Sequence, residues 1–134
     1  MLEAVVALLP ALGGLLKDAL KRRRLQDARG QDAVAAILRA VNETKLYVSA
    51  LARGVQRDTN REAELSRHWT DAAAKLHGID DDLAQRFRLK GEYWVAPDQW
   101  DGEKVEQARI LLTEVAADAD ALLGWQRRGS GPAG

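Results

Sequence analysis

The feature that most constrains the fold is a row of apolar residues spaced three and four apart through the middle of the chain. Spacing of this kind places side chains on one face of an α-helix. Leu38 and Ala52 widen the row to the breadth of a helix in a bundle, rather than a narrow two-stranded coiled-coil seam. We therefore expect a long amphipathic helix that ends near Gly54. The row consists of Val34, Ile37, Val41, Thr44, Val48, Leu51 and Val55.

A second row of the same kind predicts another helix. Thr59 stands three residues before Glu62, and we expect these two side chains to form a capping box at its first turn. The row continues past Gly78, so we expect the helix to run through this glycine to about Lys90. Its members are Leu65, Trp69, Ala72, Leu76, Ile79, Leu83 and Phe87, of which Trp69 is expected in the core.

Residues 91–102 form the connection that is densest in aromatic side chains, and we expect an ordered elbow there. Trp94 and Trp100 either pin this elbow to the bundle or form an exposed anchor for a partner. Asp98 or Asp101 then caps the last helix. The apolar row of that helix is Val105, Ala108, Leu112, Val115, Ala119 and Leu122.

The N-terminal end is the most asymmetric part of the chain, because its first sixteen residues carry one charge, at Glu3, and a basic run follows. The charges follow the apolar run instead of preceding it, which argues against a secretory signal. A helix over residues 2–16 would span about 22 Å, short of the roughly 30 Å needed to cross a bilayer. We expect this segment to pack against the other three helices, or to contact a partner or membrane. The residues assigned to such a contact are Val5, Leu8, Leu9, Leu12, Leu15, Leu16, Lys21, Arg22, Arg23 and Arg24, together with Trp94 and Trp100.

These segments together predict an all-α fold. Three amphipathic helices and an apolar N-terminal helix are most simply arranged as a mainly antiparallel four-helix bundle, with the aromatic-rich loop before the last helix. The length of 134 residues suits one domain. We place that domain at residues 1–128 and a flexible tail at residues 129–134.

Composition limits the classes of partner and chemistry. Twenty basic and twenty acidic side chains cancel, so the chain lacks the broad positive field that favours nucleic acid as a partner. The absence of cysteine excludes disulfides, thiol nucleophiles and thiolate metal sites. We expect a cytoplasmic address, with peripheral membrane association as the alternative.

The sequence offers little for a metal, a cofactor or catalysis. His68 and His77 stand nine residues apart, which would place them on opposite sides of one helix. The three consecutive residues Asp80, Asp81 and Asp82 fan out around a helix and lack the glycine and terminal glutamate of an EF-hand. We therefore expect no metal and no cofactor, and a protein without catalytic activity.

One motif favours a catalytic alternative. Arg61 and His68, separated by six residues, resemble the R-x4-6-H signature of the HEPN ribonucleases, which are also all-helical. The resemblance covers these two residues only, and Glu62 stands where that family usually has a polar residue. It implies cleavage of RNA phosphodiesters, with the arginine and histidine meeting across a dimer cleft.

The function that we predict from the sequence is a protein–protein interaction module, either an adaptor or a small subunit of a larger assembly. Its partner would be another protein or a second copy of the chain. The alternative is a membrane-acting effector that uses the apolar N-terminal helix and the adjacent basic run on an anionic membrane. Its layout is similar to that of HeLo-like and necroptotic bundles, which carry a releasable hydrophobic end.

Overall fold

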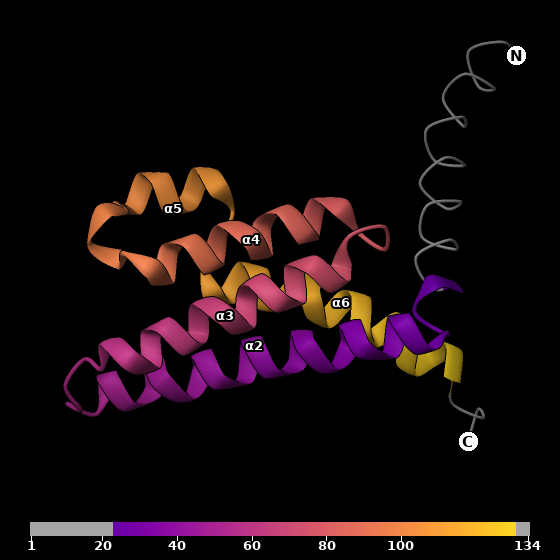
Figure 1. Cartoon of the computed structure of the whole chain (residues 1–134), viewed down its shortest axis with the longest axis horizontal. Coiled ribbons are helices and arrows are strands. Elements are labelled where there is room, and N and C mark those ends of the chain that lie inside the picture. Colours follow the sequence, from indigo (N-terminus) through magenta and orange to yellow (C-terminus); the bar gives the residue numbers. More distant parts are fainter. Residues whose placement is uncertain (1–22, 131–134) are drawn as a thin grey trace, which may run out of the picture.

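The computed structural model describes residues 23–130, and their side chains as far as Gly124. The predicted all-α class is confirmed, since the described residues contain helices and no strand. Figure 1 shows their arrangement. The elements are α2 (Ala28–Ala52), α3 (Thr59–Leu76), α4 (Asp81–Val95), the 3-10 turn η1 (Pro97–Gln99), α5 (Gly102–Ala108) and α6 (Leu112–Ser130).

Four of these helices form the bundle. Helices α3 and α4 share the most extensive interface, α2 packs on α3, and α6 contacts both α4 and α2 (Figure 1). One continuous core connects all four. Among the described residues the bundle consists of α2, α3, α4 and α6, and the predicted N-terminal helix falls on residues that this description does not include. The N-terminal residues 1–22 lie outside the described residues.

The predicted helix through Gly78 is wrong, because the chain reverses direction there. Helix α3 ends at Leu76, and Gly78 has a φ of +84°, a left-handed conformation that glycine adopts without steric cost. The Asp81 carboxylate accepts a hydrogen bond from the Gly78 amide at 2.7 Å. Asp80 caps α4 by accepting from the Leu83 amide at 3.2 Å. The two aspartates thus satisfy amides of the turn and of the first turn of α4.

The last predicted helix is also divided. Asp101 caps α5 by accepting from the Lys104 amide at 2.7 Å, which confirms one of the two expected caps. The chain then turns at Arg109, whose φ of 58° is left-handed, and Ile110 enters the core with no exposed surface. The buried Arg86 in α4 donates from Nε to the Arg109 carbonyl at 3.0 Å, which holds this turn in place.

The core face of α2 is rotated from the predicted row. Ile37, Val41 and Thr44 are buried as expected, but Leu38 is 44% exposed and Val48 40% exposed. Alanine is the most frequent residue on the rotated face. This face is completed by Ala33, Ala36, Ala40, Tyr47 and Ala50.

Trp69 lies in the core, as its position in the apolar row predicted. It has no exposed surface, and its ring meets Phe87 edge-on with centroids 4.7 Å apart. Its indole Nε1 donates to the Thr44 hydroxyl at 2.7 Å, and that hydroxyl donates to the Ala40 carbonyl at 2.7 Å. Thr44, the single polar member of the α2 row, therefore provides the acceptor that the buried N–H of Trp69 requires.

Helix α6 continues to Ser130, two residues into the predicted tail 129–134, and the remaining four residues lie outside the described part. No helix within residues 23–130 is long and apolar enough to cross a membrane.

Replacing Gly78 with alanine tests the reversal between α3 and α4. Alanine in the left-handed region costs about 1–2 kcal/mol. Its Cβ would also lie 3.3 Å from Nη2 of Arg29, which donates to the His77 carbonyl at 2.7 Å. We expect Gly78→Ala to lower the free energy of unfolding by about 1–2 kcal/mol in urea denaturation.

Gly124→Ala is the matched control, because Gly124 lies inside α6 and an added carbon there meets open space. Alanine at such a position gains roughly 0.5–1 kcal/mol of helix stability. A Gly78→Ala protein as stable as the unchanged chain would contradict the role given to this turn.

Candidate functional site

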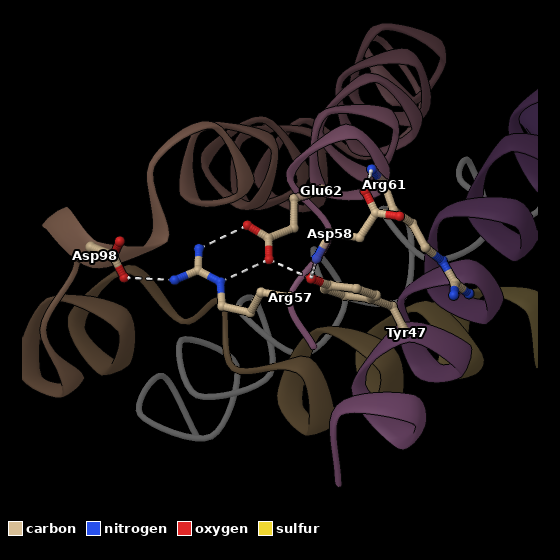
Figure 2. Close-up of polar contacts among 6 residues, drawn as sticks. All are labelled: Tyr47, Arg57, Asp58, Arg61, Glu62 and Asp98. Atoms are coloured by element: carbon tan, nitrogen blue, oxygen red, sulfur yellow. Dashed lines mark hydrogen bonds and ion pairs between the residues drawn. The ribbon is translucent and has the colours of Figure 1, made fainter. Parts of the chain in front are cut away.

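A buried polar network joins the end of α2 to the start of α3 (Figure 2). The Tyr47 hydroxyl donates to the Glu62 carboxylate and accepts from the Asp58 amide at 3.0 Å. Tyr47 is 1% exposed and Glu62 is 4% exposed. Arg57 binds the same carboxylate twice, from Nε at 3.0 Å and from Nη2 at 2.8 Å. The network therefore fixes the α2–α3 connection against both helices.

The expected capping box at Thr59 and Glu62 is wrong by one residue. Asp58 is the N-cap, and its carboxylate accepts from the Arg61 amide at 3.1 Å. Glu62 is directed toward Tyr47 and Arg57 instead of the cap amide. A charged guanidinium is a stronger donor to a carboxylate than a backbone amide, which accounts for the different partner.

Arg57 also links the network to the aromatic elbow, through Nη1 at 3.0 Å from the Asp98 carboxylate. Asp98 thus pairs with Arg57 and does not cap the last helix. The Asp98 side chain is 84% exposed, so this arm of the network is weak. Cavities of about 510 Å³ and 300 Å³ flank the pair, and Trp94 contributes to the walls of both.

The charges of the network stabilise one another. The Arg57 guanidinium holds the pKa of Glu62 below its usual value, with a further contribution from the Tyr47 hydroxyl, although burial opposes the shift. Burial, followed by the hydrogen bond to Glu62, raises the pKa of Tyr47. Near neutral pH the carboxylate is therefore ionised, the phenol is protonated, and each is bound to the other. This arrangement suits a structural lock between helices.

The predicted elbow begins too early, because α4 runs past Gly91 to Val95 and so includes Trp94. Trp94 and Trp100 also differ in exposure. Trp94 is 6% exposed and meets Tyr47 edge-on, with ring centroids 5.7 Å apart. It therefore pins the elbow to the bundle and is not an exposed anchor. Trp100 is partly buried, lies edge-on to Tyr93 at 6.2 Å, and has Lys104 Nζ 4.1 Å from its ring centroid.

Lys90 is a buried cation that the sequence interpretation missed. Its side chain lies on α4 with 5% exposure, and Nζ is 4.7 Å from the Tyr93 ring centroid and 6.0 Å from that of Trp94. Burial lowers the pKa of Lys90 to about 8. A signal was available, because Lys90 stands three residues after Phe87 and four before Trp94, in line with the apolar row.

The remaining predicted site residues are not brought to one place. Arg23 and Arg24 are exposed ahead of α2. The Arg61 guanidinium lies 5.3 Å from the Tyr47 ring centroid, and His68 is partly buried two turns further along α3. The other members of the predicted contact lie outside the described residues: Val5, Leu8, Leu9, Leu12, Leu15, Leu16, Lys21 and Arg22.

Within the part of the chain that the structure describes, no three histidine or acidic side chains are grouped so as to hold a metal ion. His77 lies exposed at the end of α3, and the first two of the consecutive aspartates accept from backbone amides.

Comparison with known proteins gave no relative: no protein-family model, curated protein or solved structure matches this chain.

Replacing Glu62 with glutamine removes the charge of the network while keeping its size. We expect the free energy of unfolding at pH 7 to fall by about 1–3 kcal/mol, because hydrogen bonds to a charged acceptor become neutral ones. The folded-state pKa of Glu62 is lowered, so its contribution is present above about pH 4.3 and is lost as the pH falls through the folded value. The stability gap should therefore close below about pH 4 in denaturant titrations.

Glu64→Gln provides the control, since Glu64 is exposed on the same helix. A gap between Glu62→Gln and the unchanged chain that persists at strongly acidic pH would show that the carboxylate charge is not the cause.

Replacing Lys90 with methionine tests the buried cation. Lysine has an unfolded-state pKa of about 10.4, so between pH 8 and that value the unfolded chain binds more protons and stability rises with pH. The fall in the pKa of Lys90 to about 8 corresponds to about 3 kcal/mol, offset by about 1 kcal/mol of cation–π contact. We expect Lys90→Met to be the more stable protein at pH 7, with the difference shrinking toward about pH 9.5.

Lys75→Met is the matched control, at a lysine on α3 whose side chain is 42% exposed. A Lys90→Met protein that loses stability at every pH would mean that the ring contacts outweigh the cost of burying the charge.

Proposed function

We propose that this chain is a non-catalytic interaction module, an adaptor or small subunit, whose apolar N-terminal segment binds a protein partner or a second copy. One observation carries the proposal: within residues 23–130, α2, α3, α4 and α6 already share one continuous core, and the sequence places an apolar run at residues 2–16 in front of them. A contiguous apolar segment next to a bundle that has a core of its own is typical of an interaction site.

The composition of the segment supports this role. Residues 2–16 carry one charge, at Glu3, and their apolar side chains would surround a helix on all sides. A helix of that kind is stable in water only when other surfaces enclose it. The surface of one neighbouring helix covers one side, so a further surface is needed.

The polar network supports a role without catalysis. Tyr47, Arg57 and Glu62 bind one another, and each contact holds the α2–α3 connection in place. Catalytic acids and bases instead present a proton-transfer atom toward a substrate. The network keeps the bundle rigid, which lowers the entropic cost of presenting an interaction surface.

Introducing a charged residue into the apolar segment, residues 2–16, tests the proposal. We expect the full chain to associate, with itself or with a partner that co-purifies with it from its native host, and Leu12→Glu to abolish this association. The measurement is sedimentation velocity across a concentration series, with the co-purified proteins compared by mass spectrometry. Val95→Glu is the control, because Val95 is 73% exposed on α4 and does not belong to the segment.

Equal association by Leu12→Glu and the unchanged chain would contradict the proposal. Loss of helical structure in Leu12→Glu, followed by circular dichroism, would place the segment in the core and would contradict it as well.

The second candidate function is that of a membrane-acting effector, and the exposed Arg23 and Arg24 favour it. They extend the basic run of Lys21 and Arg22 at the end of the apolar segment. Each basic residue near an anionic surface contributes about 1 kcal/mol. An apolar helix beside such a run has the composition of an interfacial helix.

Co-sedimentation with anionic and neutral liposomes, at low and high salt, separates the two functions. Salt-sensitive binding of the full chain to anionic liposomes, lost in Leu12→Glu, would favour the effector. Association in solution without any liposome binding would favour the protein–protein module.

A further inference from the structure

Helix α2 has a second row of side chains along the edge of the bundle core, which we call the outer row. Its members follow at spacings of four and three residues, so they share one face of the helix. Leu38 and Val48 are 44% and 40% exposed, and Val34 is partly buried. Val41 is 7% exposed and Lys45 is charged, so the outer row is a mainly apolar strip that the described bundle leaves partly in contact with water. It consists of Val34, Leu38, Val41, Lys45, Val48 and Ala52.

The chain enters α2 on this same face. Gly30 lies one turn before Val34 and in line with the outer row. A Cβ at Gly30 would lie 2.4 Å from both the Arg24 carbonyl oxygen and the Leu25 Cα, so the preceding chain passes directly over it. Gln31 holds this crossing by donating to the Leu25 carbonyl at 3.0 Å. The described part of the chain therefore begins at one end of the outer row.

The apolar segment contains a row that matches the outer row in reverse. Read backwards from the crossing, it also follows spacings of four and three, and it consists of Leu20, Leu16, Gly13, Leu9, Val6 and Leu2. Arg24 lies beside Gly30. A helix over residues 2–20 that runs antiparallel to α2 from this point has each member of its row opposite one member of the outer row. The apolar pairs are Leu20 with Val34, Leu16 with Leu38, and Val6 with Val48.

Length and charge agree with the same register. Residues 2–20 and 34–52 would each span about 27 Å as helices. Gly13 falls opposite Val41, where the absence of a side chain lets two helices approach. Arg22 falls opposite Asp32, which pairs opposite charges. The tether is short, so docking within one chain is favoured over docking between chains by a high effective concentration.

We propose that residues 2–20 dock as an antiparallel helix on the outer row of α2 in the same chain. This covers one side of the apolar segment and leaves its far side open. The docking stands on its own; its consequence, that a partner binds the far side or displaces the helix, rests on the proposed function. The docked helix thereby presents the binding segment in a fixed orientation.

Cysteine pairs test the docking directly, because the chain has no cysteine of its own. The full chain with Val6→Cys and Val48→Cys is oxidised at low concentration, and the products are separated by non-reducing electrophoresis. Val6→Cys with Leu46→Cys is the control: Leu46 is 57% exposed but lies about 160° around the helix from Val48. A second pair, Leu16→Cys with Leu38→Cys, tests the register independently.

We expect both matched pairs to form intramolecular disulfides at least about tenfold faster than the control, since docking holds the thiols together. Equal rates at positions 46 and 48 would mean that the segment is tethered but undocked, and would overturn the proposal. Disulfide-linked dimers as the main product would assign the outer row to a second copy and would also overturn it. No partner is needed, so the result is independent of the association test.

Discussion

The bundle depends on the reversal at Gly78. A left-handed glycine, followed by two aspartates that accept amide hydrogen bonds, ends one helix and starts the next within a few residues. Helices α3 and α4 can then pack antiparallel along their whole length, with Trp69 against Phe87 in the core. This pair provides the surface on which α2 and α6 assemble. The division of one apparent helix into two also supplies the fourth helix of the bundle within residues 23–130.

The sequence was sufficient for the fold class, the apolar rows and the core position of Trp69. It was insufficient at Gly78 because the buried residues of α3 and those of α4 happen to follow one continuous spacing of threes and fours. The spacing therefore continues across the turn as if the two helices were one. Periodicity records which residues are buried, and it does not record a change of direction. The break at Arg109 was missed for the same reason, since a left-handed arginine has no signature of its own.

The polar network could not be predicted because its members come from separate elements. Tyr47 and Glu62 stand fifteen residues apart, and Asp98 joins them only after α4 has brought the elbow back to the α2–α3 connection. Local rules assigned Glu62 to the cap of its own helix. The stronger, more distant donors on Arg57 and Tyr47 determined its actual orientation. The core face of α2 was predicted from the positions of its large apolar side chains. Alanine is instead the residue that this face buries most often, so the prediction was rotated around the helix.

That alanine face determines how firmly α2 is held. An alanine buries one methyl group where a leucine would bury a whole side chain, so each turn of α2 contributes less burial energy than a turn of the α3–α4 pair. When a protein opens in part, the element with the least burial energy separates first. Helix α2 is also the element that residues 23–27 join to the N-terminal segment. Strain at that end therefore acts first on α2, ahead of the Tyr47–Glu62 contact that fixes the other end of this helix to α3.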